Sequence, residues 1–203
     1  MMEALLLLII FDRFNLISGF KINWSKSALM PLNDVRPENI EDLRIPLVGQ
    51  IKYLGIEFFP SSALTAQYNF DLIRGRIEGD LSRWATTHNS FQSRVSIIKM
   101  NILPRVNYVS SMLPLPPPKQ HWTNINKAMS TFLWKNKRAR VKLGTLQRRA
   151  LSGGWGIPNF ERYHHASILR ALHVWFNRDA GVAWRPIEAA NVSPHRLQDL
   201  VFF

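Results

Sequence analysis

The residues best suited to chemistry form one run, in which Trp134 to Lys142 read Trp-Lys-Asn-Lys-Arg-Ala-Arg-Val-Lys. Lysine and arginine bind phosphate groups, and an indole ring can stack on a base. The run lies within an 80-residue block, Leu81 to Phe160, that holds 13 Lys or Arg and neither Asp nor Glu. This pattern indicates contact with a polyanion through Lys135, Lys137, Arg138, Arg140 and Lys142; a solvated linker or a localisation-like signal is the alternative.

The charge of the chain is concentrated in its second part. Residues 1–80 hold 8 basic and 10 acidic side chains, whereas residues 81–203 hold 18 basic and 4 acidic ones. The formal net charge of the 203 residues is +12. A segment this basic repels itself unless the charge is spread over a surface or neutralised by a partner. We expect nucleic acid as the partner, ahead of a generically basic domain and of an anionic membrane face.

Residues for catalysis are largely missing from the sequence. The absence of cysteine excludes disulfides, thiolate zinc sites and cysteine nucleophiles. The acids before residue 81 form no Asp-Asp or Asp-x-Asp pair, which two-metal phosphoryl transfer requires. His164 and His165 are adjacent but have no further ligand at useful spacing, so we expect them to be solvated. The sequence therefore predicts no metal site and no cofactor.

The elements that must position the basic block are predicted to be mostly helical, with a small N-terminal strand or hairpin, which is an α+β fold. The apolar stretch from Glu3 to Ile17 is too short for a membrane span and lacks a basic leader, so it predicts a buried helix ended by Ser18-Gly19. Alternation in Phe20–Asn23 and β-forming residues in Ile51–Phe59 predict strands. The Pro-rich segment between them predicts a loop with one short helix at Pro37–Leu43.

Helical periodicity dominates after Pro60. One apolar stripe consists of Phe70, Ile73, Ile77, Leu81 and Trp84, and the intervening charged residues up to Asp80 are expected to face solvent. Ser90 is a candidate cap for the next helix, and further helices are expected from Trp122 and over Tyr163–Phe176. The tryptophans lie near these stripes, so we expect core packing rather than base stacking for Trp84, Trp122, Trp155 and Trp175.

Six segments, in order, give the chain a family resemblance. Gly19–Ser27 resembles the G-x-K-I-N-x-x-K-S segment of reverse transcriptases of LINE-type (non-LTR) retrotransposons, and Ile51–Ile56 resembles the K-Y-L-G hairpin of their primer grip. The later segments are similar to the thumb and to the region beyond it: Leu81–Trp84, Ser96–Arg105, Leu113–Pro118, and the series Trp122 to Trp134, Gly153–Phe160 and Tyr163.

The resemblance implies a division into a palm-tail remnant at 1–60, a thumb-like helical region at 61–113 and a post-thumb connector at 114–203. It implies that Lys26 lies near the leaving pyrophosphate of an incoming nucleotide. It also implies a primer-grip role for Tyr53, Leu54 and Gly55. Further nucleic-acid contacts are implied for Lys21, Asn23, Arg94, Lys99 and Arg105, with an RNA–DNA hybrid or a duplex read by shape and charge.

The sequence departs from the family in one respect, because the paired aspartates that bind Mg²⁺ in the family lie before the first helix and are not present here. We therefore expect a truncated reverse transcriptase that binds primer–template without polymerising, with no secretion or membrane signal and a nuclear or cytoplasmic location. A palm and fingers supplied by another chain would complete it. A basic helical binding or interaction module unrelated to polymerases, and a non-functional retroelement remnant, are the alternatives.

Overall fold

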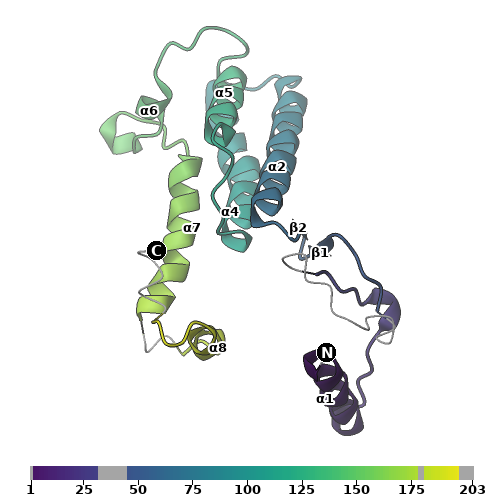
Figure 1. Cartoon of the computed structure of the whole chain (residues 1–203). Helices are drawn as coiled ribbons and strands as arrows, with labels where there is room; N and C mark the ends of the chain where they lie inside the picture. The colour runs from purple at the N-terminus through teal and green to yellow at the C-terminus, as the bar shows by residue number, and fades with distance from the viewer. Residues whose placement is uncertain (1, 32–44, 178–180, 197–203) are drawn as a thin grey trace. The chain divides into compact units, whose positions relative to one another are not determined.

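The computed structural model describes residues 2–31, 45–177 and 181–196 (Figure 1). Helices make up most of these residues, and their one sheet is a two-stranded antiparallel hairpin. The expected mostly helical α+β class is therefore confirmed. The chain divides into two compact units, Met1–Asn69 and Phe70–Phe203, and each is described separately below. No helix in the described ranges combines the length and apolarity needed to cross a membrane.

The N-terminal unit opens with α1, Met2–Ser18, which confirms the expected helix. Gly19 follows it in the left-handed region at φ 73°, and its amide donates to the Asn15 carbonyl at 2.8 Å. The expected burial is wrong for the described side chains of this helix, which begin at Ile9, since Leu16 is 87% exposed and Ile17 is 88% exposed. Apolar residues select the helix, but among the described residues no layer covers these side chains. The unit thus presents an uncovered apolar helix face.

The connection that follows α1 contains less β-structure than expected. Phe20–Asn23 forms no strand, and the prediction there is wrong; the Phe20 ring instead stacks on that of Phe14, with centroids 6.4 Å apart. A 3₁₀ turn, η1, covers Trp24–Lys26, and Leu29 then makes an isolated parallel bridge to Leu47. The helix predicted at 37–43 lies outside the described residues.

The predicted strand over residues 51–59 is in fact a hairpin. Strands β1, Ile51–Tyr53, and β2, Ile56–Phe58, pair antiparallel, with Tyr53 opposite Ile56. The two residues between them, Leu54 and Gly55, have φ values of 47° and 80°. Two successive positive φ angles are those of a type I′ turn, whose twist matches that of paired strands. The β-forming residue types predicted extended chain over 51–59, and this turn interrupts it.

Two side chains at the start of α2, Ser62–Ala85, attach the hairpin to that helix. The Asn69 amide accepts from the Glu57 backbone N–H at 3.1 Å and donates to the Glu57 carbonyl at 2.7 Å. Thr65 Oγ1 accepts from the Phe59 N–H at 2.9 Å. Both side chains are buried, so these bonds supply the outer edge of β2 with partners that a longer sheet would otherwise provide.

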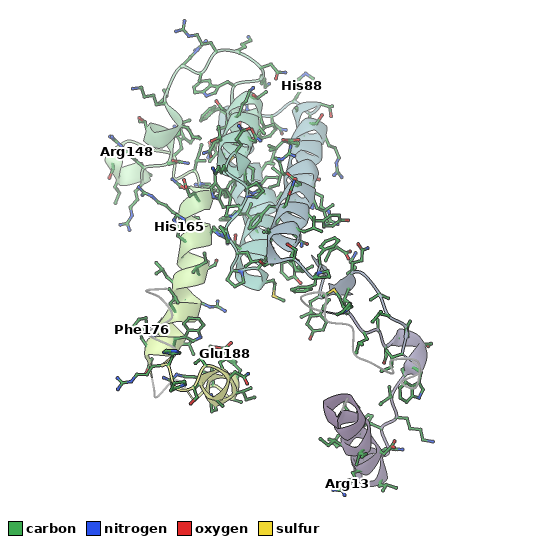
Figure 2. All side chains as sticks on the ribbon, viewed as in Figure 1. Arg13, His88, Arg148, His165, Phe176 and Glu188 are labelled. Atoms are coloured by element: carbon green, nitrogen blue, oxygen red, sulfur yellow. The ribbon has the colours of Figure 1, made fainter. Side chains whose placement is uncertain are left out.

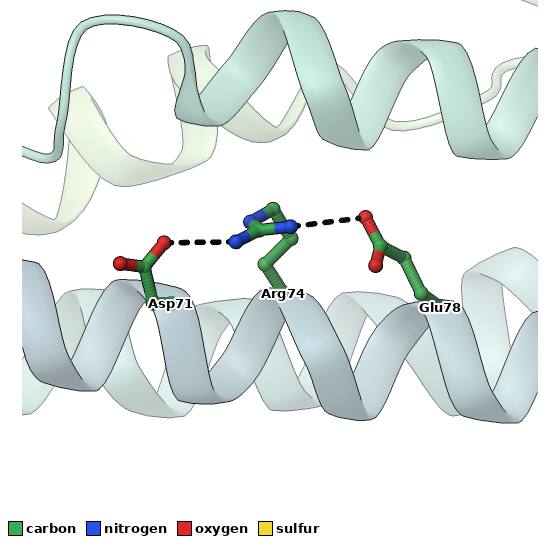
Figure 3. Close-up of polar contacts among 3 residues, drawn as sticks. All are labelled: Asp71, Arg74 and Glu78. Carbon is green, nitrogen blue, oxygen red and sulfur yellow. Dashed lines mark hydrogen bonds and ion pairs between the residues drawn. The ribbon is translucent and has the colours of Figure 1, made fainter.

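In the C-terminal unit, the expected apolar stripe of α2 is confirmed by burial of Phe70, Ile73, Ile77 and Leu81. The core packing expected for Trp84, at the end of the stripe, is wrong, because this side chain is 37% exposed. The expected solvated face is partly confirmed. Arg74 bridges Asp71 at 3.1 Å and Glu78 at 3.5 Å along the helix surface (Figure 3). The hydrogen bond that Arg74 donates to Asp71 is the main cause of the raised pKa of Arg74. Asp80, however, is buried, which corrects the prediction that it is solvated.

Three consecutive helical segments follow α2. Ser90 caps α3, Phe91–Ile97, as predicted, and its hydroxyl accepts from the Ser93 N–H at 3.1 Å. A π-helical turn, η3, covers Ile98–Ile102 and leads into α4, Leu103–Met112. Pro104 lies in the first turn of α4, directly after the π turn. Val95, Ile98 and Ile102 are buried as expected.

The remaining helices are α5 (His121–Leu133), α6 (Leu143–Leu146), the 3₁₀ turn η4 (Ala150–Ser152), α7 (Phe160–Phe176) and α8 (Trp184–Asn191). Helix α7 packs along α4. Its buried His164 ring meets Phe70 of α2 at 5.6 Å and Trp122 of α5 at 5.5 Å between centroids. The expectation that both adjacent histidines are solvated is therefore wrong for His164, although His165 on α7 is exposed (Figure 2).

Candidate nucleic-acid interface

Residues 135–142, called the basic loop below, join α5 to α6 as one long connection (Figure 1). Helix α5 ends at Leu133, and Lys135 and Asn136 then adopt positive φ angles of 51° and 61°. Asparagine tolerates this left-handed conformation better than most residues, so the sequence favours a sharp change of direction here. All eight residues of the loop are exposed, which leaves its cations in contact with solvent.

Three aromatic rings stand beside the basic loop. The ring of Phe91, at the start of α3, lies 5.3 Å from that of Trp134 and 5.2 Å from that of Trp155 between centroids. Trp134 is half-buried, and Trp155 is 44% exposed. The expected core role of Trp155 is therefore only partly met, since its ring packs on Phe91 on one side and contacts solvent on the other.

The loop and the rings enclose a groove of about 1130 Å³, called the aromatic–basic groove below. Its wall combines cations with apolar side chains, a mixture suited to a ligand with phosphates and flat rings. The lining residues that carry this chemistry are Phe91, Arg94, Trp134, Trp155 and four cations of the basic loop, Lys135, Lys137, Arg138 and Arg140.

Arg94 lines this groove although it is only 8% exposed. One guanidinium nitrogen, Nη1, donates to the Asn89 carbonyl at 2.8 Å, and the group lies 5.8 Å from the centroid of the Phe91 ring. Its Nε has no hydrogen-bond partner, and no ion pair involves it, within the described part of the chain. Burial lowers the pKa of Arg94 from its usual value. The groove wall therefore contains a buried cation that forms no ion pair with a carboxylate of the described residues, although Glu78 lines a second pocket together with Arg94.

Backbone hydrogen bonds hold the segment that carries Trp155 against α6. The Leu146 carbonyl accepts from the Trp155 N–H at 2.9 Å and from the Ile157 N–H at 3.1 Å. Gly154 passes so close to this segment that a Cβ there would lie 2.1 Å from the Arg148 carbonyl oxygen. A side chain at this position is thus excluded by the backbone of a neighbouring turn. Arg148 itself projects from the end of α6 (Figure 2).

The cations named from the sequence fall into different surroundings. Arg94 and four residues of the basic loop line the groove, whereas Lys142 lies on the same loop outside the lining. Lys99 donates to the Trp155 carbonyl at 2.8 Å and so takes part in holding the wall. Arg105 pairs with Asp80 at 2.9 Å, and the same carboxylate also pairs with Arg83. Arg105 is therefore held by an acid, which reduces its availability for phosphate.

The other residues implied by the resemblance belong to the N-terminal unit. Lys21, Asn23 and Lys26 are exposed, and Asn23 Oδ1 accepts from the Ser25 hydroxyl at 2.7 Å. The primer-grip candidates Tyr53, Leu54 and Gly55 form the exposed end of the hairpin. Each group is accessible to a ligand, but none of these residues lines the aromatic–basic groove.

Sequence reasoning missed Phe91 and the burial of Arg94. Phe91 follows the predicted cap Ser90, but its contacts with Trp134 and Trp155 join residues far apart in the chain. A local pattern such as helical periodicity does not report contacts of this kind. The lack of any acid from Leu81 to Phe160 was the available signal for Arg94, since no carboxylate in that block could pair with it.

The described residues contain no group of three or more His, Asp or Glu side chains placed to hold a metal ion. Among protein-family models, none matches the chain.

Proposed function

We propose that this chain binds nucleic acid without sequence specificity, through the basic loop and the aromatic–basic groove. Four exposed cations of the loop line one groove together with Arg94, which is buried and forms no ion pair among the described residues. This observation carries the proposal. Lysine and arginine on an exposed loop neutralise phosphates and release counterions, which favours binding to any sequence. Phosphate contacts position a protein on nucleic acid but do not identify bases.

We further propose that the parent activity is that of a LINE-type reverse transcriptase, with this chain corresponding to palm tail, thumb and connector. The six ordered sequence motifs support this assignment. The ligand would then be an RNA–DNA hybrid or a duplex, and the exposed hairpin end at Tyr53–Gly55 would approach a primer terminus. We expect no nucleotide incorporation by the chain alone, because the sequence lacks the paired carboxylates that hold two metal ions.

The test is a salt titration of binding to an RNA–DNA hybrid and to DNA duplexes of two unrelated sequences. We expect similar affinities for all three and a linear fall of log Kobs with log salt. Replacing Lys137, Arg138 and Arg140 by Gln should lower the magnitude of the slope by about 2 to 3. The control is Lys127→Gln, an exposed cation on α5 outside the groove, which should leave the slope nearly unchanged. Affinity that does not depend on salt would refute the proposal.

A protein-interaction module is the second candidate, and the exposed apolar face of α1 favours it. Ile9, Ile10, Phe14, Leu16 and Ile17 are all exposed on this helix. Uncovered apolar surface promotes association with a partner or with further copies. If this is the main role, concentration-dependent light scattering should persist after the three Gln substitutions in the loop and disappear when Phe14, Leu16 and Ile17 are replaced by Ser.

A further inference from the structure

We propose that the aromatic–basic groove holds an unpaired nucleotide of a single strand, with its base stacked on Trp155 and its phosphate bound by Arg94. This inference rests on the proposed nucleic-acid binding and goes beyond it, because it gives the groove a preference for single strands. Three features support it: Arg94 lacks a negative partner, the ring of Trp155 is accessible, and an unpaired base can reach that ring more easily than a base in a duplex.

The missing negative partner of Arg94 is the strongest support for this proposal. A charge removed from water costs several kcal/mol unless an opposite charge or hydrogen bonds compensate it. Here one carbonyl and one ring face serve the guanidinium, and its Nε has no partner among the described residues. A phosphate in the groove would place the missing negative charge beside the guanidinium. Guanidinium binds phosphate in two parallel hydrogen bonds, a geometry that lysine cannot supply.

The second feature is the ring of Trp155. Its ring is partly open to solvent, yet its backbone is fixed by bonds to α6 and by the Lys99 ammonium. The Phe91 ring contacts the Trp155 ring in a T-shaped arrangement, with an interplanar angle of 74°. A ring held in place in this way loses little conformational freedom when a base stacks on it, so less binding energy is spent on ordering. Stacking on an aromatic side chain tolerates any base, in keeping with sequence-independent binding.

The third feature, the accessibility of a base to the groove, distinguishes single strands from duplexes. In a duplex both faces of every base are covered by its neighbours, so a base can reach Trp155 only if it leaves the stack. Extruding a base costs a few kcal/mol. An unpaired base avoids this cost, whereas the basic loop can contact the flanking phosphates in either case. The groove should therefore add affinity for single strands alone.

The experiment compares three probes of equal length by fluorescence anisotropy: oligothymidylate, the same backbone with abasic sites, and the RNA–DNA hybrid. We expect the full chain to bind oligothymidylate about tenfold more tightly than the other two, the size of one stacking contact. Trp155→Leu keeps an apolar side chain but removes the ring. It should lower oligothymidylate affinity about tenfold and leave affinity for the abasic strand unchanged.

Arg94→Gln tests the phosphate contact through the salt dependence of binding. The slope for the single strand should decrease by about 0.7, the contribution of one phosphate. Lys127→Gln is the control and should leave this slope nearly unchanged. Circular dichroism verifies the fold of each variant; if Arg94→Gln does not fold, Arg94→Lys, which keeps the charge but cannot form two parallel bonds, should still weaken oligothymidylate binding several-fold.

Two failures are distinguishable. If the hybrid and the abasic strand bind as tightly as oligothymidylate, the inference is overturned and the proposed function stands. If none of the probes binds, both are overturned. A loss of affinity in Arg94→Gln with an unchanged salt slope would mean that Arg94 only positions the wall, which contradicts its assignment to phosphate.

Discussion

Lys99 and Trp155 are joined by a hydrogen bond of 2.8 Å from the Lys99 ammonium to the Trp155 backbone carbonyl. The donor belongs to the π-helical turn η3, and the acceptor to the loop that precedes α7. The contact thus fixes the wall of the aromatic–basic groove to a separate helix. Lys99, for which the family resemblance implies a nucleic-acid contact, thus has a partner within the chain.

From this contact we expect Lys99→Met to lower the free energy of unfolding by about 1 kcal/mol, since methionine keeps the side-chain length but cannot donate. Urea unfolding followed by circular dichroism measures the change. In the binding assay, the magnitude of the slope of log Kobs against log salt should fall less for Lys99→Met than for Arg138→Gln on the basic loop. An equal fall in both variants would mean that Lys99 also binds phosphate.

Gly154 gives a second prediction. Because a Cβ there would lie 2.1 Å from the Arg148 carbonyl, Gly154→Ala should displace the Trp155 segment and destabilise the chain by about 2 kcal/mol or more. Gly144→Ala is the control, since nothing lies within 4 Å of its added Cβ and the position is helical. Thermal unfolding should separate the two variants clearly. Equal melting temperatures would contradict the close approach at Gly154.

The buried histidines give a third prediction, for pH. Burial, followed by the charge of Arg74, lowers the pKa of His121 from 6.5 to about 4, and burial also lowers the pKa of His164. The unfolded chain therefore takes up protons that the folded chain does not. Stability should be fully present above pH 6.5 and decrease as the pH falls from 6.5 to 4, by about 2 to 3 kcal/mol for His121.

The measurement is the free energy of unfolding in urea at several pH values between 4 and 8. His121→Phe keeps an aromatic ring beside Phe70 but cannot titrate, so its curve should be flatter in this range. His165→Phe, at an exposed position of α7, is the control and should retain the pH dependence of the original chain. A His121→Phe curve as steep as the original would show that other groups cause the loss.

Asp80 gives a fourth prediction. Its buried carboxylate pairs with Arg83 and Arg105, so Asp80→Asn should lower the free energy of unfolding by about 1 to 3 kcal/mol. Asp71→Asn removes an exposed acid from the same helix and should change stability by less than about 1 kcal/mol. Urea unfolding of both variants tests the comparison. Similar losses of stability in the two variants would mean that the buried ion pairs of Asp80 are no stronger than the exposed ion pair of Asp71.

Local patterns predicted the helices well, because their determinants are local. The stripe from Phe70 to Leu81 and the cap at Ser90 each depend on residues within a few positions of one another. The strand expected at Phe20–Asn23 failed for the opposite reason. A strand requires a partner elsewhere in the chain, and none pairs with this segment among the described residues.

The candidate site was predictable in its charges but not in its shape. The acid-free block identified Arg94 and the basic loop as cations, since composition is a property of sequence. It did not distinguish Arg94, which is buried in the groove wall, from Arg105, which is held by Asp80. Tertiary contacts decide between these two outcomes. Burial of His164 beside exposed His165 is a similar case, because adjacent helical residues point in different directions.

The π-helical turn at Ile98–Ile102 has a consequence for how this region tolerates changes in length. A π turn contains one residue more than the α-helical turn it replaces. Deleting Met100, which is exposed, would restore regular α-helical winding. Because the wider π turn absorbs its extra residue, the helical segments before and after it would keep nearly the same relative orientation. The chain should therefore tolerate the loss of Met100 better than the loss of one residue from a regular α-helical turn such as those of α2.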